Sequence, residues 1–307
     1  MIAEEDESEE ELEEGVQLGF VEEAFLSERM LFECGNWCDW DGGIAGGQPS
    51  WLGGQPSARA LQCEACGRAC VFLLEIYAPL DEPEAAFHRA LYVFWCARCE
   101  VRAKVLRRQL PRRNDYYDFE SPTTDDLRPL KSSTVTPTVS PTRFEVVVEA
   151  EPPETIIDDV VQAVAPPEDS TQDASVTQEA LNDAAGAAPP PDETTLRFLA
   201  RVAREPAQVL RYKRRGRPLY VSRRLRTTRV APCERCGAPR SFEFQIMPQF
   251  LYFLNVEKNL RDLNFGTILV FTCDNSCDSP DFATELAIIQ PPLDDHPQLE
   301  PLAFRRF

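Results

Sequence analysis

The sequence lacks the features that mark several large classes of protein. No run of about 18 apolar residues occurs, so no segment is expected to span a membrane. No basic segment followed by an apolar stretch opens the chain, which argues against a secretory signal peptide. Walker, GxSxG, HExxH and GxGxxG motifs are all missing, and the 2 histidines leave little acid–base capacity near neutral pH. We therefore expect that the protein is not an enzyme.

Positive charge is scarce in two stretches of the chain. Residues 1–14 hold nine acidic and no basic side chains, and residues 121–195 hold fifteen acidic and three basic ones. Together they sum to −21 against −19 for the whole chain, so the remainder is close to neutral. Residues 121–195 also hold eleven of the 26 prolines. Because blocks of like charge repel each other and stay solvated, we expect both stretches to be disordered.

Cysteine is missing from residues 100–232, and the 11 cysteines flank this gap in a repeated pattern. The CEACG motif at Cys63–Gly67 recurs as CERCG at Cys233–Gly237. In both stretches a GxP segment precedes this motif, and an apolar run and a second pair of cysteines follow it. The order of motifs is the same in both stretches, which indicates that one unit occurs twice.

Each copy supplies four cysteines with the spacing of a structural zinc site. Two such pairs, brought together by strands, can complete a tetrahedral shell of thiolates, and a closed shell indicates a structural ion, not a catalytic one. Redox chemistry is the weaker alternative, since the βαβ context of a thioredoxin fold is missing. A residue with positive φ is commonly needed after such a pair, where Gly67 and Gly237 stand. The sequence predicts two zinc ions, one bound by Cys63, Cys66, Cys96 and Cys99, and one by Cys233, Cys236, Cys273 and Cys277.

Three cysteines have no counterpart in the second copy. Cys34, Cys38 and Cys70 could form a third site with His88, but we favour ordinary thiols.

The chain divides into five segments. We expect an acidic tail (1–14), an N-terminal zinc-binding half (15–120), an acidic, proline-rich linker (121–195), a C-terminal zinc-binding half (196–293) and a short tail (294–307). The linker contains a helical pattern at Thr155–Val164, which is either a transient helix or a docking motif. Leu196, Leu199, Val202 and Ala203 predict a helix that ends at Pro206. Short apolar runs predict strands at Val71–Tyr77, Leu91–Trp95, Ser241–Ile246 and Thr267–Thr272, and Phe250–Leu254 is ambiguous.

A basic run extends from Arg211 to Arg229, with Tyr212 and Tyr220 among nine Lys and Arg residues. Basic residues interleaved with aromatics can bind single-stranded nucleic acid, but a solvated strand face or a docking surface for the acidic linker explains them equally. The acidic stretches would compete with phosphate for such a patch, so direct nucleic-acid binding is the secondary reading. Acidic arms are instead suited to shielding a very basic polypeptide. Candidate partner contacts are Trp51, Tyr77, Arg211, Tyr212 and Tyr220.

The chain resembles the programmed cell death protein 2 family. The resemblance rests on short motifs in both halves, and the cysteine-free stretch places the chain with the programmed cell death protein 2-like branch, which lacks an extra MYND zinc finger. These motifs are VQLGF (Val16–Phe20), GGQPSWL (Gly46–Leu52), CEACG, FLLEIYAPL (Phe72–Leu80), FHRALYVF (Phe87–Phe94), QLPRRNDYY (Gln109–Tyr117), QVLRY (Gln208–Tyr212), GRPLYV (Gly216–Val221), APCERCGAPRSFEFQIMPQ (Ala231–Gln249) and FGTILVFTC (Phe265–Cys273).

The resemblance implies a dedicated, ATP-independent chaperone. Such a protein holds the newly made ribosomal protein two of the small (40S) subunit, which is basic and carries an Arg/Gly-rich extension, and so supports 40S ribosome biogenesis. We expect a monomer in the cytoplasm that can shuttle to the nucleus. The rival functions are a zinc-ribbon nucleic-acid binder and an adaptor linked to apoptosis or transcription. The expected fold is a β-rich α+β arrangement, in which two duplicated, zinc-stabilised halves pack as one pseudo-symmetric unit joined by the disordered linker.

Overall fold

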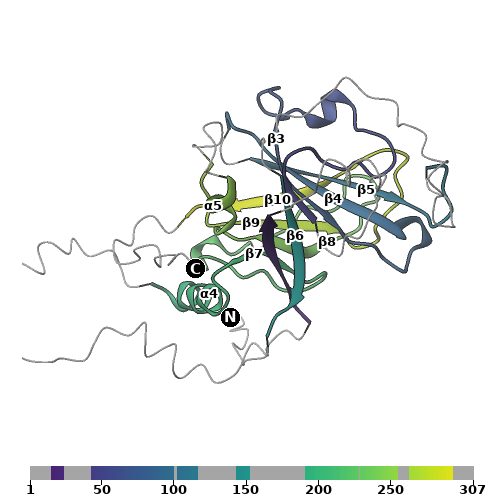
Figure 1. The fold of residues 1–307 in the computed structure, drawn as a ribbon. Coiled ribbons are helices and arrows are strands. Elements are labelled where there is room, and N and C mark those ends of the chain that lie inside the picture. Colours follow the sequence, from purple (N-terminus) through teal and green to yellow (C-terminus); the bar gives the residue numbers. More distant parts are fainter. Residues whose placement is uncertain are drawn as a thin grey trace, which may run out of the picture.

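Ten antiparallel strands close into a single barrel in the computed structural model (Figure 1). The structure describes residues 15–23, 43–99, 102–116, 143–152, 191–227, 229–254 and 263–292. Within these ranges, two α-helices and three short 3₁₀ helices accompany the barrel. None of the described helices has the length and apolar character that crossing a membrane requires.

The elements follow one another along the chain as strands separated by short helices. In chain order they are β1 (Gln17–Glu23), β2 (Gly43–Gly46), η1 (Ala58–Leu61), β3 (Val71–Tyr77), η2 (Glu84–Ala86), β4 (His88–Trp95), β5 (Ala103–Leu110), β6 (Arg143–Ala150), α4 (Glu193–Arg204), β7 (Gln208–Tyr212), η3 (Arg223–Leu225), β8 (Arg240–Ile246), α5 (Phe250–Leu254), β9 (Thr267–Cys273) and β10 (Ala283–Gln290).

The two copies of the cassette form neighbouring arcs of the same barrel wall. The strand order is β1-β6-β2-β3-β4-β5-β10-β9-β8-β7, and β1 also pairs with β7 to close the ring. The expected α+β fold of two packed halves is therefore wrong. An isolated sheet from either copy would expose unpaired strand edges, and pairing β5 with β10 and β1 with β7 removes those edges.

The barrel wall is apolar on both faces where it carries the cassettes. One core fills the interior and takes side chains from around the ring, such as Leu91, Val146 and Ile268. A second core covers the outer face of β3 to β5, where Trp51 and Leu61 pack on Tyr92 and Phe94. Strands buried on both faces are nearly continuous hydrophobic runs, and all four strands predicted from such runs are confirmed.

The strand β6 lies inside the stretch predicted to be a disordered linker. For residues 143–150 that prediction is wrong, because β6 pairs with β1 on one side and β2 on the other. Its Val146 side chain is 1% exposed and belongs to the interior core. The stabilisation from burying β6 in the sheet outweighs the tendency to disorder of its acidic, proline-rich flanks. The helical pattern at 155–164 lies outside the described residues.

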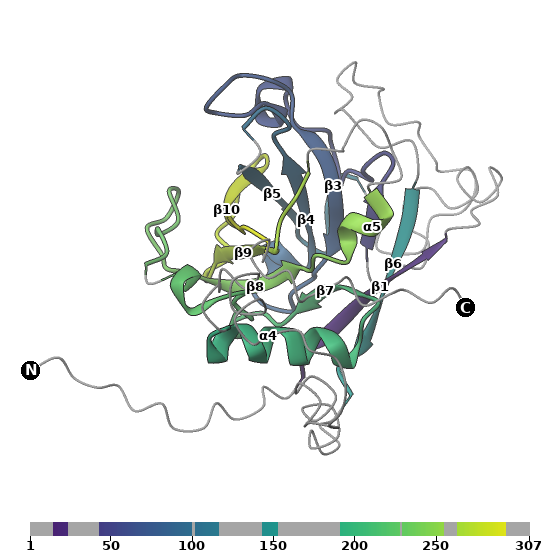
Figure 2. The ribbon, with the colours of Figure 1, turned by 90° about the vertical axis from the view of Figure 1, so that its left-hand side faces the viewer.

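Helix α4 confirms the helix predicted before Pro206. The Asp192 carboxylate caps it by accepting a hydrogen bond from the Thr195 amide at 2.8 Å. Phe198 faces inward and packs with Val221 and Met247. Figure 2 shows α4 lying across one end of the barrel, beneath β7 and β8. The ambiguous run Phe250–Leu254 forms α5, whose Phe250 and Leu254 enter the interior core.

A buried ion pair crosses the interior of the barrel. Both guanidinium nitrogens of Arg89 on β4 donate to the Glu243 carboxylate on β8, at 2.6 and 2.7 Å, and both side chains are 0% exposed. The hydroxyl groups of Tyr212 and Thr272 also donate to this carboxylate. Burial raises the pKa of Glu243, but the Arg89 charge and its hydrogen bonds hold that pKa below its ordinary value. The pair ties together strands that are not neighbours in the wall.

A second buried carboxyl, Glu75 on β3, has no cationic hydrogen-bond partner among the residues that the structure describes. One of its oxygens accepts from the Ser50 amide at 2.6 Å, and the other has no partner. Burial raises its pKa to about 8, although the Ser50 amide and the nearby Arg143 charge oppose that rise. The folded protein therefore keeps Glu75 protonated up to about pH 8, whereas in the unfolded chain this carboxyl releases its proton above the ordinary pKa of 4.5.

Stability is expected to fall as pH rises from about 5 to about 8. Because the folded pKa lies above the unfolded one, the unfolded state binds fewer protons in this window, and the slope reaches at most about 1.4 kcal/mol per pH unit. Glu75→Gln, which mimics the protonated carboxyl, should flatten this slope in denaturant unfolding at stepped pH values. The exposed Glu149→Gln variant should keep it. An unchanged slope in Glu75→Gln would contradict this account.

Candidate metal centres

The first group of cysteines brings four sulfur atoms together beside β4. Cys63 and Cys66 lie in the turn that follows η1, while Cys96 and Cys99 lie in the turn between β4 and β5. The four sulfur atoms lie within 4.8 Å of one another, with Cys63 Sγ 3.9 Å from Cys99 Sγ and Cys66 Sγ 3.5 Å from Cys96 Sγ. The two pairs are separated by at least 30 residues, from Cys66 to Cys96, and they become neighbours because β3 and β4 form an antiparallel hairpin.

The second group has the same arrangement beside β9. Cys233 and Cys236 precede β8, Cys273 ends β9, and Cys277 follows it. The sulfur atoms again lie within 4.8 Å, with Cys233 Sγ 3.8 Å from Cys277 Sγ and Cys236 Sγ 3.5 Å from Cys273 Sγ. The structure thus assembles both predicted ligand sets, each with the four members that the sequence indicated.

Backbone hydrogen bonds shape each cysteine turn before any ion enters. The Gly67 amide donates to the Cys63 carbonyl at 2.8 Å, and the Gly237 amide donates to the Cys233 carbonyl at 2.9 Å. Gly67 and Gly237 have φ values of +70° and +72°, which confirms the predicted need for positive φ. A Cβ built at either position would meet nothing within 4 Å, so the backbone conformation itself requires glycine there.

The electrostatics of both groups favour a cation. Burial raises the pKa of the Cys63 thiol, but hydrogen bonds from the Cys66 and Ala65 amides bring it down to about 7. The same balance, with amides of Cys236 and Arg235, brings the pKa of Cys233 to about 7. Burial, followed by hydrogen bonds with neighbouring thiols, raises the pKa of Cys277 to about 12. Four crowded thiols cannot all ionise unless a positive charge joins them.

The geometry of the sulfur atoms is suited to zinc. A tetrahedral Zn²⁺ ion with Zn–S bonds of about 2.3 Å places its sulfur ligands about 3.8 Å apart. The close sulfur pairs here are separated by 3.5 to 3.9 Å. Each shell is complete with four thiols, so it leaves no coordination position for a substrate. The donor sets fit a structural ion.

Buried arginines connect the second group to the rest of the barrel. Arg107 on β5 donates to the Cys277 carbonyl at 3.0 Å and to Glu285 on β10 at 2.7 Å. Arg240 on β8 donates to the same Glu285 carboxylate at 3.1 Å, and that carboxylate accepts from the Cys273 amide. This network anchors a cysteine turn of one copy on a strand of the other.

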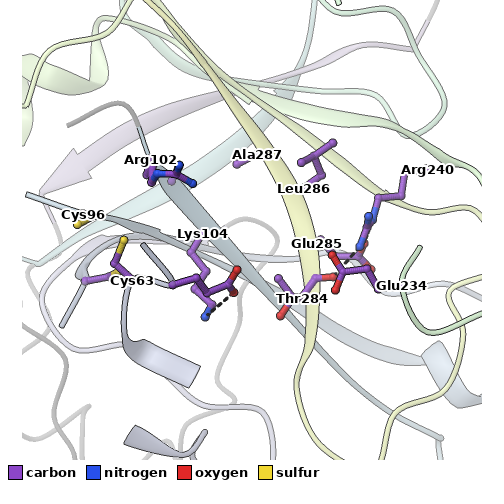
Figure 3. Close-up of a pocket in the computed structure, with 13 residues that line it drawn as sticks. Cys63, Cys96, Arg102, Lys104, Glu234, Arg240, Thr284, Glu285, Leu286 and Ala287 are labelled. Carbon is purple, nitrogen blue, oxygen red and sulfur yellow. Dashed lines mark hydrogen bonds and ion pairs between the residues drawn. The ribbon is translucent and has the colours of Figure 1, made fainter. Parts of the chain in front are cut away.

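A cavity of about 350 Å³ lies between the two centres, where just three residue pairs join β5 to β10. Figure 3 shows Cys63, Cys96, Arg102 and Lys104 on one side, Glu234 and Arg240 on the other, and Thr284, Leu286 and Ala287 of β10 between them. Lys104 pairs with Glu64 at 3.3 Å, and Arg240 pairs with Glu285 at 3.1 Å. The lining carries three acidic and three basic side chains, so the cavity has no strong preference for one sign of ligand.

The remaining cysteines and histidine do not extend the metal-binding groups of the described residues. Cys70 is 1% exposed, and burial raises its thiol pKa to about 12. His88 Nδ1 lies 2.9 Å from the Tyr77 hydroxyl, and Phe87 packs edge-on against the imidazole ring. Cys34 and Cys38 lie outside the described residues. A third site built on Cys70 and His88 therefore has no support in this part of the chain.

The five candidate partner contacts lie in different parts of the fold. Trp51 is 8% exposed and stacks on Phe94, so it belongs to the outer core. Arg211 pairs with Glu151 at 2.8 Å, and Tyr212 donates to Glu243. Tyr77 contacts His88, and Tyr220 packs against the outer apolar cluster of β8 and β9. The sequence singled out large aromatic and basic groups, and the fold uses them as packing and ion-pair residues.

Comparison with known proteins places both cassettes in one family. Residues 15–124 match the family model described as "Programmed cell death protein 2, N-terminal domain", and residues 192–291 match "Programmed cell death protein 2, C-terminal putative domain". A mouse relative named Programmed cell death protein 2 is 30% identical over 85% of this chain and 92% of its own length. A human relative named Programmed cell death protein 2-like is 39% identical over 32% of this chain and 29% of its own length.

A more distant relative carries a different name. The Schizosaccharomyces pombe protein named Probable 20S rRNA accumulation protein 4 is 36% identical over 29% of this chain and 24% of its own length. No solved structure matches the chain. None of the matched families and relatives is named for an enzymatic activity. The matches do not separate the branch without the MYND finger from the rest of the family.

Proposed function

This chain belongs to the programmed cell death protein 2 family, and from that premise we propose that it takes part in ribosome biogenesis. The observation that carries the proposal is the fission-yeast relative whose name refers to the accumulation of 20S rRNA. The region that the two proteins share is short. The proposal therefore carries the role in that relative's name over to this chain. The absence of any known catalytic motif in the sequence supports a binding role.

In finer detail, we propose a holding chaperone for a basic ribosomal protein of the small subunit, namely ribosomal protein two with its Arg/Gly-rich extension. Two acidic stretches support this proposal, since residues 1–14 and 121–195 together carry a balance of −21. Acidic groups attract a basic polypeptide and keep it from premature contact with RNA phosphates. Holding requires no ATP, in agreement with the missing Walker motif. We propose a monomer that works in the cytoplasm and shuttles to the nucleus.

The two cysteine groups are proposed to hold structural zinc. A bound ion would stabilise the four thiolates and lock each cysteine turn onto the barrel. Catalysis is not part of this role, because the ligand shells are closed. The chain's own residues would instead present a fixed surface to the client.

Capture from cells tests the chaperone proposal. Tagged full-length protein, purified at low ionic strength, is expected to retain one basic ribosomal protein in equal amount. The complex should survive nuclease treatment. Recovery of RNA that nuclease removes, without a stoichiometric protein, would favour direct nucleic-acid binding by the basic run from Arg211 to Arg229.

Deleting residues 1–14 is expected to slow association with the captured ribosomal protein on the order of tenfold at low salt, because acidic arms steer a basic partner. Stopped-flow or biosensor measurements over a salt series would show the effect. A matched variant with Gln and Asn in place of the nine acidic residues keeps the length and should behave like the deletion. Equal rates for all three proteins would reduce the tail to a solubility element.

A further inference from the structure

A strongly basic segment covers the outer face of β8 and β9. We call residues 213–235 the arginine surface. It contains nine basic side chains and one acidic side chain, Glu234, for a net charge of +8. Seven of the basic side chains are exposed, although several have partners within the fold: Arg215, Arg217, Arg223, Arg224, Arg226, Arg229 and Arg235.

Buried glutamines hold this segment in place. The Leu219 amide donates to Gln245 Oε1 at 2.8 Å, and the Val221 amide donates to Gln290 Oε1 at 2.9 Å. Gln290 Nε2 in turn donates to the Leu225 carbonyl at 2.8 Å. The exposed guanidinium groups therefore lie on a backbone that is fixed to β8 and β10. A fixed array of cations binds anions better than a flexible one because less ordering is required.

Within the described residues, some exposed arginines of the surface donate hydrogen bonds to neutral backbone carbonyl groups. Arg215 donates to the Asp274 carbonyl at 3.3 Å, and Arg235 donates to the Asp278 carbonyl at 3.2 Å. Arg215 also lies 3.7 Å from the Asp274 carboxylate, but its side chain is 62% exposed. Carbonyl groups satisfy donors without cancelling charge. A net positive charge therefore remains on this face.

The acidic N-terminal stretch joins the barrel at this surface. β1 pairs with β7, so Gln17 lies opposite Tyr212 (Figure 2). The Lys213 ammonium group lies beside Gly15, where a Cβ would sit 3.0 Å from its Nζ. Residues 1–14 carry nine acidic and no basic side chains. A stretch of this length reaches up to about 46 Å from Gly15.

We propose that residues 1–14 bind the arginine surface and occupy an anion-binding site that would otherwise accept nucleic-acid phosphates. Attachment at Gly15 gives the acidic stretch an effective concentration on the order of 1 mM at this surface. At 0.1 M salt, the attraction between the acidic stretch and the arginine surface extends over about 10 Å, and added salt weakens it. The proposal concerns a contact within the chain, and the basic client proposed above would compete with the arginine surface for residues 1–14.

Zero-length carbodiimide crosslinking of the full-length protein tests the contact. Arg224→Lys and Arg229→Lys keep the charge and introduce amines at exposed positions other than Lys213, where crosslinking to carboxylates can be mapped by mass spectrometry. We expect crosslinks from Glu4–Glu10 to both positions at about 10 mM salt and their loss at about 1 M. The matched control, Arg59→Lys in η1 on the other cassette, should give none. Crosslinks confined to Lys213, or crosslinks from acidic residues of 153–190 alone, would overturn the proposal.

Binding of a fluorescent single-stranded oligonucleotide provides the second readout. Removing residues 1–14 should raise its affinity on the order of tenfold, because the competing acidic stretch is gone. Adding Arg223→Gln, Arg224→Gln, Arg226→Gln and Arg229→Gln to the deletion should abolish this gain. Circular dichroism would verify that these exposed substitutions leave the fold intact. Equal affinity of the full-length and shortened proteins would show that residues 1–14 do not occupy the surface.

Discussion

Cys273→Ser is expected to remove one of the two zinc ions proposed above and to lower the free energy of unfolding by about 4–5 kcal/mol or more. Cys273 is 0% exposed at the end of β9, with its sulfur 3.5 Å from that of Cys236. A serine hydroxyl is a poorer zinc ligand, and the remaining thiols would repel one another when ionised. In small zinc domains, ion binding supplies on the order of 10 kcal/mol of folding free energy. The barrel core retains part of the stability here.

Metal analysis of the purified protein and thermal unfolding together measure this effect. Cys70→Ser is the matched control, because Cys70 is equally buried but belongs to neither group. It should keep both ions and lose at most about 1 kcal/mol for the buried hydroxyl. A Cys273→Ser protein that retains two ions and its stability would show that the second group does not bind metal.

Arg89→Met is expected to cost about 3–5 kcal/mol, the second large effect. The substitution leaves the Glu243 carboxylate fully buried without its bidentate partner. The Tyr212 and Thr272 hydroxyl groups still donate to it, but they supply no positive charge. Urea unfolding of the variant at neutral pH measures the loss. The cost arises mainly from an uncompensated charge and not from the lost contact itself.

A double-mutant cycle separates these two contributions. Arg89→Met combined with Glu243→Leu should recover most of the stability, since no buried charge remains. The exposed i,i+4 pair of Arg197 and Glu193 on α4 is the control, and Arg197→Met should cost under about 1 kcal/mol. Additive losses in the buried cycle would mean that Arg89 and Glu243 do not depend on each other.

Local sequence patterns were sufficient for the metal groups and for several elements. A CxxC or CxxxC turn points both sulfurs to one side whatever the rest of the fold does, so spacing alone identified the eight cysteines that the structure brings together in two groups. β3, β4, β8 and β9 are buried on both faces, which leaves an uninterrupted apolar run in the sequence. Helix α4 combines a capping aspartate with helical spacing, and both signals are local.

Other strands were missed because tertiary contacts override their local signal. In β5, Arg107, Arg108 and Gln109 are buried, but they read as a polar break in the strand pattern. Glu285 interrupts the apolar pattern of β10 in the same way, and its buried carboxylate accepts hydrogen bonds from Arg107 and Arg240. The strand β6 lies among acidic, proline-rich residues that favour disorder, and pairing with β1 and β2 overrides them.

The sequence by itself determined the two cysteine groups, their order along the chain and the family, since each depends on spacing over a few residues or on matching motifs. Only the tertiary structure decided that both cassettes share one barrel, that Arg89 meets Glu243 across it, and that the acidic N-terminal stretch emerges beside Lys213. These features join residues far apart in sequence. They follow from the pairing of exposed strand edges and the neutralisation of buried charge, which no local pattern records.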